Sequence, residues 1–214
     1  MILRPLCHTA VMLVCAMWLT GCASLHEDLH VRLSYGALPS EQTPLSELKP
    51  MTIGICVEDR RDEAERDRVG NRINSFGAVL AKTVPQPQPP EAMQKALKTQ
   101  FENNGLTVIL PGETNAPPAD AMVVVEINRY WCEAKMHFWE VEVVGTVNAE
   151  VTISISSSPT VILSKSLGGS YHKSEQVVQN LEYQNALNGA LKEFIHEFSF
   201  DPAILDALRK ARSE

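Results

Sequence analysis

The sequence is short of positive charge. It carries 19 lysine and arginine residues against 26 aspartate and glutamate residues, and its formal net charge at pH 7 is −7. Nonspecific nucleic-acid binding requires a basic face that neutralises phosphates, and anionic headgroups attract basic segments in the same way. We therefore expect no nucleic-acid partner, and no docking on a membrane through charge alone.

Reaction motifs are also missing. The sequence has no C-x-x-C pair and no G-x-G-x-x-G dinucleotide fingerprint. Gly168-Gly169-Ser170 lacks the lysine of a phosphate-binding loop, and the residues before Ser75 lack the glycine of a nucleophile elbow. We predict a protein that is not an enzyme, with no catalytic residues, no cofactor and no metal ligands.

Two stretches of the sequence resemble metal-binding motifs. Residues 26–30 read H-E-D-L-H, which matches the H-E-x-x-H zinc motif, but that motif works only on a helix and here lies in an expected tether. Residues 59–68 are almost all charged, yet they lack the central glycine and terminal glutamate of a calcium loop. We interpret the first as a chance match and the second as a solvated loop whose charges pair with one another.

The N-terminus has the pattern of an export signal. Arg4 supplies an early positive charge, residues 9–19 form an apolar run without charge, and small residues follow. The run is too short to span a membrane, which takes about 20 apolar residues. We predict that residues 1–21 are a signal peptide that is removed.

Leu19-Thr20-Gly21-Cys22 resembles the lipobox of bacterial lipoproteins. The resemblance implies cleavage before Cys22, a diacylglycerol on the Cys22 sulfur and a further acyl chain on its amine. Two or three acyl chains hold a protein stably at a membrane. Enteric lipoproteins that stay in the inner membrane have aspartate after this cysteine, so Ala23 implies the outer membrane, with the protein facing the periplasm.

The mature chain is expected to divide into a lipidated tether, residues 22–50, and a single periplasmic domain, residues 51–214. The apolar and β-branched residues 51–57 (MTIGICV) predict a buried strand. The polar residues 58–88 predict a long loop, and loops of this length are often functional.

Periodicity predicts the rest of the domain. Pro89 and Gly105 bracket a helix with one apolar face. Residues 121–127 and 141–155 predict strands, and a hairpin turn within residues 132–138 explains a change of phase between them. A further strand, an amphipathic helix and a short last helix follow. We predict an α+β fold, with an antiparallel or mixed sheet that contains a long β-hairpin and is covered on one face by two main helices.

The sequence leaves two local questions open. Cys56 and Cys132 remain in the mature domain, either as a disulfide formed in the oxidising periplasm or as two free thiols on separate strands. Four aromatic residues near the predicted turn form either a core layer or an exposed binding patch: Tyr130, Trp131, Phe138 and Trp139.

The order of these features resembles the YajG-type lipoprotein family of Gram-negative envelopes. The resemblance rests on the lipobox, on Asp59-Arg60-Arg61 after the first core strand, on Gly70 and Gly77, and on a helix that ends in Asn104-Gly105-Leu106. It covers most of the mature chain. It implies an outer-membrane, periplasm-facing lipoprotein, and it supplies no catalytic residues.

Two functions fit this sequence. The first is a non-enzymatic binding module of the cell envelope, whose partner is an envelope protein or the cell wall. We expect its partner-binding residues in the polar loop, at Asp59, Arg61, Gly70, Asn71 and Gly77. The alternative is an accessory lipoprotein for lipid transport, of the kind that assists ABC transporters, with acyl chains held along the apolar side of the hairpin or in a helix groove.

Overall fold

The structure is a computed structural model. It describes residues 27–36, 43–74, 76–113, 117–136, 138–158, 160–176 and 180–213. The expected signal peptide, Cys22 and His26 lie outside the described residues.

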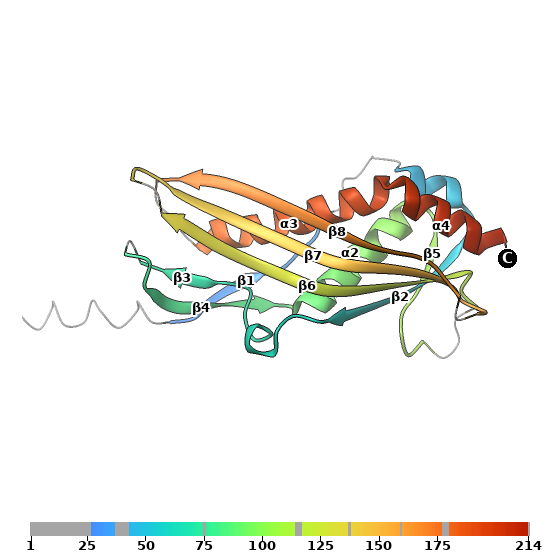
Figure 1. Cartoon of the computed structure of the whole chain (residues 1–214), viewed down its shortest axis with the longest axis horizontal. Helices are drawn as coiled ribbons and strands as arrows, with labels where there is room; N and C mark the ends of the chain where they lie inside the picture. The colour runs from blue at the N-terminus through green and yellow to red at the C-terminus, as the bar shows by residue number, and fades with distance from the viewer. Residues whose placement is uncertain are drawn as a thin grey trace, which may run out of the picture.

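The larger sheet has the strand order β5-β2-β6-β7-β8 (Figure 1). Its strands are β2 (Thr52–Asp59), β5 (Thr107–Ile109), β6 (Ala121–Met136), β7 (Val141–Ile155) and β8 (Val161–Glu175). β2 runs parallel to both β5 and β6, whereas β6, β7 and β8 pair antiparallel. The sheet is therefore mixed.

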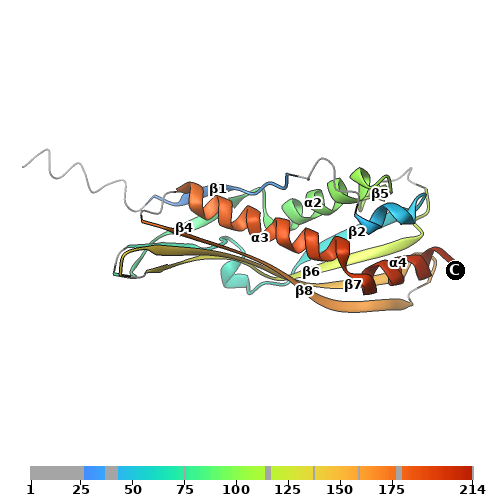
Figure 2. The same cartoon turned by 90° about the horizontal axis from the view of Figure 1, so that it is seen from above.

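Three helices cover one face of this sheet (Figure 2). They are α2 (Pro89–Asn103), α3 (Asn180–Phe200) and α4 (Pro202–Ser213). Gly105, with φ of 77°, follows α2 in the left-handed conformation that glycine adopts most easily. Asp201 caps α4, because its Oδ1 accepts hydrogen bonds from the backbone N–H groups of Ala203 and Ile204 at 2.9 and 3.2 Å. The predicted α+β class is confirmed.

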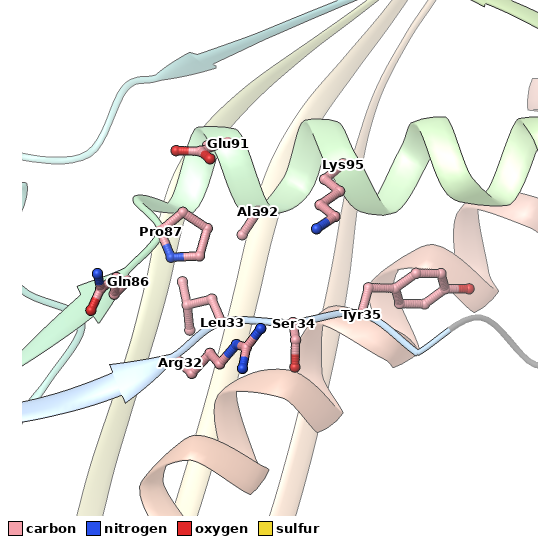
Figure 3. Close-up of a pocket in the computed structure, with 9 residues that line it drawn as sticks. All are labelled: Arg32, Leu33, Ser34, Tyr35, Gln86, Pro87, Glu91, Ala92 and Lys95. Atoms are coloured by element: carbon pink, nitrogen blue, oxygen red, sulfur yellow. The ribbon is translucent and has the colours of Figure 1, made fainter.

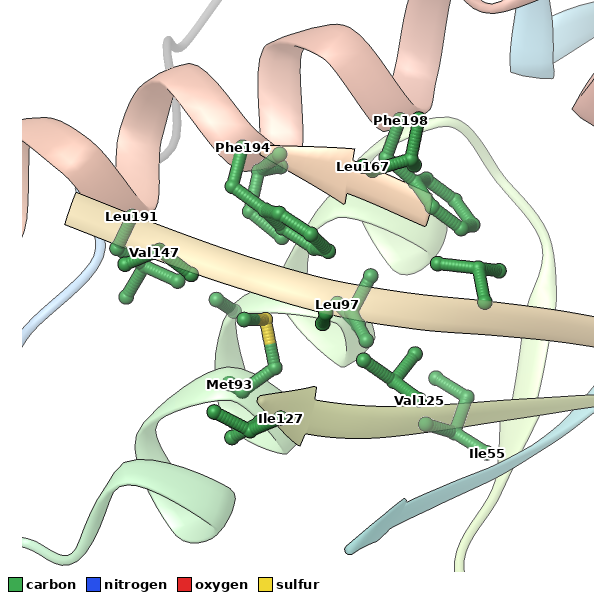
Figure 4. Packing of buried hydrophobic residues seen from close by; sticks show 14 of the residues in the cluster. Ile55, Met93, Leu97, Val125, Ile127, Val147, Leu167, Leu191, Phe194 and Phe198 are labelled. Carbon is green, nitrogen blue, oxygen red and sulfur yellow. The ribbon is translucent and has the colours of Figure 1, made fainter. Parts of the chain in front are cut away.

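The core lies between the sheet and these helices (Figure 4). Side chains of α2 and α3 face inward-pointing residues of β2, β6 and β7. Phe101 and Phe198 meet edge to face across the two helices, with ring centroids 5.6 Å apart. Burial of this apolar surface is the main force that holds the layers together.

A second sheet corrects two of the predictions. It has the order β1-β4-β3, formed by β1 (Leu29–Arg32), β4 (Val79–Gln86) and β3 (Asn71–Ile73). The expected loop, residues 58–88, thus contains the strands β3 and β4. They were not predicted because the apolar alternation of this segment is weak and its partner β1 is distant in sequence.

The expected tether also contributes to the fold. Leu29 and Val31 of β1, and Leu45 and Leu48 of the 3-10 helix η2 (Pro44–Leu48), are buried in the core. The folded domain therefore extends at least to Leu29 instead of beginning at Met51.

The long hairpin is present, with an irregularity inside β6. Its turn joins Met136 to Val141, so the predicted range of 132–138 began too early. A β-bulge leaves Asn128 unpaired, since Ile127 pairs with Ala149 and Arg129 pairs with Asn148. The buried positions of β6 are consequently odd up to Ile127 and even from Tyr130.

Glycines allow α3 to lie directly on the hairpin and β8. A Cβ atom at Gly145 would lie 2.1 Å from the carbonyl oxygen of Ala186, and one at Gly169 would lie 2.2 Å from that of Ala190. Only residues without a side chain fit at these two positions. The helix therefore packs backbone to backbone on β7 and β8.

Candidate functional site

Arg61 is a structural residue instead of an exposed contact. It is 2% exposed, and it forms a bidentate ion pair with Asp59: Nε donates to Oδ1 at 2.9 Å and Nη2 to Oδ2 at 2.8 Å. Its Nη1 also donates to the carbonyl oxygen of Arg68 at 2.9 Å. These bonds tie the loop around the 3-10 helix η3 (Glu63–Glu65) to the end of β2. A partner at this loop would meet the residues that Arg61 positions.

The arginine also sets the titration of its partner. Burial raises the pKa of Asp59, but the hydrogen bonds and charge of Arg61 more than offset burial and hold this pKa below its ordinary value of 3.8. The carboxylate therefore stays ionised at neutral pH, as the ion pair requires.

The other three expected contact residues lie further along the same segment. A Cβ atom at Gly70 would lie 2.4 Å from the carbonyl oxygen of Cys132, so glycine is required for the close approach of the two backbones. Asn71 is half-buried in β3 and accepts a hydrogen bond from Arg68 at 3.5 Å. Gly77, with φ of 80°, lies in the turn between β3 and β4. The structure thus spreads these residues along β3 and its turn and does not gather them in one site.

The H-E-x-x-H match has no helix to support it. Glu27 and Asp28 precede β1, and His30 lies within that strand. No group of three potential metal ligands among His, Cys, Asp and Glu occurs within the described residues. The described part of the motif therefore has the wrong secondary structure for zinc hydrolysis.

Cys56 and Cys132 are free thiols. Cys56 pairs with Val124 and lies beside the inward-pointing Ile55, so it belongs to the open face of the sheet. Cys132 follows the bulge, is fully buried and lies opposite Gly145 on the face covered by α3. Burial raises the pKa of Cys132 to about 12, which leaves its thiol protonated and unreactive.

A pocket of about 680 Å³ lies where β1 and β4 separate (Figure 3). The backbone N–H of Leu33 still donates to the carbonyl oxygen of Gln86 at 2.9 Å. Beyond this bond, Pro87 turns the chain into α2, while residues 33–36 continue in another direction. The opening is therefore bounded by the end of β1, the end of β4 and the first turns of α2.

Hydrogen bonds hold the β1 side of the pocket in place. The backbone N–H groups of Arg32 and Ser34 donate to side-chain oxygens of Gln184 and Asn188 on α3, each at 2.9 Å. Tyr35 donates from its hydroxyl to Oε1 of Gln100 on α2 at 2.8 Å. The segment is thus fixed to α3 on one side and to α2 on the other.

Two cations border the pocket. Lys95 extends from α2 toward the segment that carries Arg32, whereas Glu91 points away (Figure 3). Neither cation has an acidic partner within 4.0 Å among the described residues. Leu33 and Ala92 are buried beneath them. An apolar floor with two unpaired cations suits a ligand that carries a carboxylate or another anionic group.

The sequence could not identify this pocket. Arg32 does occupy a polar position in the alternating stretch at residues 30–35, which is a signal for an outward-facing side chain. Its approach to Lys95 follows from the parallel pairing of β1 with β4, which joins segments that are distant in sequence. No local pattern encodes that pairing.

The apolar side of the hairpin, where acyl chains were expected, is filled by protein. Val147 and Leu167 are buried beneath Leu191 and Phe194 of α3 (Figure 4). A separate hollow of about 390 Å³ lies against β2 and β5, lined by residues that include Leu110 and Met122.

The four aromatic residues divide between the two expected roles. Tyr130 is fully buried and Trp131 is half-buried. Phe138 and Trp139, in the turn between β6 and β7, are 87% and 83% exposed. Both alternatives therefore hold in part: Tyr130 in β6 belongs to the core, whereas Phe138 and Trp139 in the following turn form an exposed patch.

Comparisons place the chain in a family. The profile of a family described as uncharacterized lipoproteins matches residues 40–209, and the protein belongs to this family. Of the helices in the described part of the chain, none has the length and hydropathy that a membrane span requires. A comparison with curated protein sequences gives no match.

The fold recurs in solved structures. A Xanthomonas campestris protein of the DUF330 family aligns with a TM-score of 0.61 at 11% identity, over 85% of this chain and 98% of that one. A minor lipoprotein from Acinetobacter baumannii aligns with a TM-score of 0.37 at 11% identity, over 76% of this chain and 94% of that one. The first likeness supports the fold.

Proposed function

We propose that this lipoprotein is a non-enzymatic binding module, anchored by Cys22 in the outer membrane and facing the periplasm. The export signal, the lipobox and the lipoprotein family support the anchor. Ala23 after the cysteine supports outer-membrane sorting, and the YajG-type order of features supports the same location.

The anchor is tested by the mass of the mature N-terminal peptide. The expected peptide begins at Cys22 and carries diacylglycerol and an acyl chain. A Cys22→Ser variant should lose the lipid and leave the membrane fraction. A mature N-terminus elsewhere, or a lipid-free Cys22 in the wild type, contradicts the proposal. Density fractionation of the two membranes then tests the sorting.

We further propose that the pocket binds a carboxylate on an extended peptide of the envelope. The observation that carries this is that Arg32 and Lys95 lie over an apolar floor without an acidic partner in the part of the chain that the structure describes. A carboxylate there would form charge-assisted hydrogen bonds to two cations that have no acidic partner among the described residues. Such peptides occur both in envelope proteins and in the peptide stems of the cell wall, so the chemistry alone leaves two sources.

Co-sedimentation with purified peptidoglycan tests the cell-wall source. The double variant Arg32→Glu, Lys95→Glu should reduce binding about tenfold or more, because two attractions become repulsions. Lys98→Glu is the matched control, since Lys98 lies on the same helix but outside the pocket, near Glu102. Binding that survives the double variant would contradict a role for the pocket. Absence of sedimentation in the wild type would leave an envelope protein as the source.

A lipid-transport accessory is the alternative function. The hollow against β2 and β5 favours it, because its lining is mainly apolar, with Glu113 as the one acidic residue among the described lining residues, and acyl chains bind apolar surfaces. Lipid should then co-purify with the detergent-free Cys22→Ser protein, and Met122→Glu should remove it. Preparations free of lipid would rule this alternative out.

A further inference from the structure

Three large aromatic side chains are exposed in two turns. Phe76 lies in the turn between β3 and β4 and is 93% exposed. Phe138 and Trp139 lie in the turn between β6 and β7, and their rings meet edge to face with centroids 4.5 Å apart. We call these three residues the aromatic tip. Exposed aromatic residues of this size mark a surface that binds something apolar or amphipathic.

Both turns lie at the same end of the molecule. The backbone N–H of Cys132 donates to the carbonyl oxygen of Val69 at 2.7 Å, and Gly70 and Cys132 form a parallel bridge. From this bridge the two chains run in the same direction to their turns. Figures 1 and 2 show both turns at the end opposite α4 and the C-terminus.

Only a short stretch of chain separates the proposed lipid anchor from the first described residues. β1 runs parallel to β4, and Asp28 accepts a hydrogen bond from the backbone N–H of Lys82 at 3.0 Å. Asp28 therefore lies beside the first half of β4, the strand that follows the β3–β4 turn. Even fully extended at ~3.5 Å per residue, the chain from Cys22 to Glu27 spans no more than about 18 Å.

The charges near the tip include two ion pairs and the exposed Glu140, which follows Trp139. Lys135 pairs with Glu133 at 3.4 Å, and Lys173 pairs with Glu175 at 2.7 Å. Attraction to an anionic surface is therefore weak, and the apolar side chains dominate. Tryptophan and phenylalanine favour the boundary between headgroups and acyl chains.

We propose that the aromatic tip inserts into the interface of the bilayer that holds the Cys22 lipid. This inference rests on the proposed lipid anchor. The tip and the acyl chains then fix the domain at two points, with α4 and the C-terminus farthest from the membrane. The binding partner of the aromatic tip is thus the bilayer surface itself.

Depth-dependent fluorescence quenching tests this proposal. The mature lipidated protein is reconstituted in phosphatidylcholine vesicles, with or without bromine on the upper acyl chain. Trp131→Phe leaves Trp139 as the emitter, because Trp18 is removed with the signal peptide. Bromolipid should cause about a twofold loss of Trp139 emission, unchanged by salt between about 0.1 and 0.5 M. Trp139→Phe leaves the half-buried Trp131, whose emission should not change.

Two further variants separate the tip from general apolar exposure. Phe76→Ser should weaken the quenching of Trp139. Val161→Ser, which changes a residue 56% exposed at the opposite end of β8, should not. Protein that floats with the vesicles while Trp139 stays unquenched overturns the tip proposal and leaves the anchor standing. Protein that does not float at all overturns both.

Discussion

Among single residues, Arg61 organises the longest charged stretch of the chain. Its guanidinium is fully buried and is satisfied by Asp59 and by backbone carbonyl groups. A buried charge is tolerated only with such partners, because desolvation is costly. The Asp-Arg-Arg signature that carried the family resemblance is therefore explained by the architecture of the loop.

We predict that Asp59→Asn destabilises the protein in a pH-dependent way. The pKa of Asp59 is lower in the folded state than in the unfolded chain. The stabilisation that the ionised carboxylate gives the folded protein is therefore complete above the unfolded-state pKa. It is lost as the pH falls through the folded-state pKa. Urea denaturation of the Cys22→Ser protein, with and without Asp59→Asn, should show a constant stability difference above about pH 5 that shrinks below about pH 4. A difference that stays constant down to about pH 2 would contradict this account.

The close packing of α3 on Gly145 of β7 leads to a prediction about stability. Gly145→Ala places a methyl group 2.1 Å from the Ala186 carbonyl oxygen, so α3 must move. Overpacking of this kind costs about 1–3 kcal/mol, and we expect the upper part of that range because backbone atoms are the obstacle. Gly36→Ala is the control, since a Cβ atom there meets nothing within 4 Å. Equal stabilities of the two variants, measured by urea denaturation, would show that α3 is not in backbone contact.

Among the elements, β6 depends on its bulge. Asn128 is exposed and unpaired, and it shifts the buried positions from odd to even. Deletion of Asn128 should turn Tyr130 and Cys132 toward the open face and cost several kcal/mol, about 4 or more, or prevent folding. Asn128→Ala keeps the bulge and should change the unfolding free energy by no more than about 0.5 kcal/mol. Calorimetry of the two variants measures both, and a stable deletion variant would contradict the assigned register.

The predictable elements are those with strong local signals. Pro89 and Gly105 mark the ends of α2, and the alternation of residues 141–155 marks β7. The second sheet escaped prediction because β4 has little apolar alternation and because its pairing with β1 spans a long sequence separation, although residues 30–35 alternate as a strand does. The pocket depends on that pairing, so the sequence could not predict it either. The sequence predicted Arg61 as a partner contact, whereas its side chain is buried and paired with Asp59.

In the whole molecule, the two proposed binding surfaces have different positions. The aromatic tip lies at the end of the molecule where β1 begins, and the pocket lies further along, where β1 and β4 diverge. An anchored domain in this orientation would leave the pocket free for a periplasmic partner. The open face of the sheet and the loop held by Arg61 remain the competing surfaces.

Photo-crosslinking in living cells tests the central claim most directly. A photoreactive residue at Ser34 reports on the pocket, one at Thr152 on the open sheet face, and one at Asp62 on the charged loop. We predict one dominant envelope adduct from Ser34, either a protein or cell-wall peptide, that is lost in the Arg32→Glu, Lys95→Glu variant and kept in Lys98→Glu. Adducts that form only from Thr152 or Asp62, or a Ser34 adduct indifferent to the charge reversal, would contradict the pocket as the binding site.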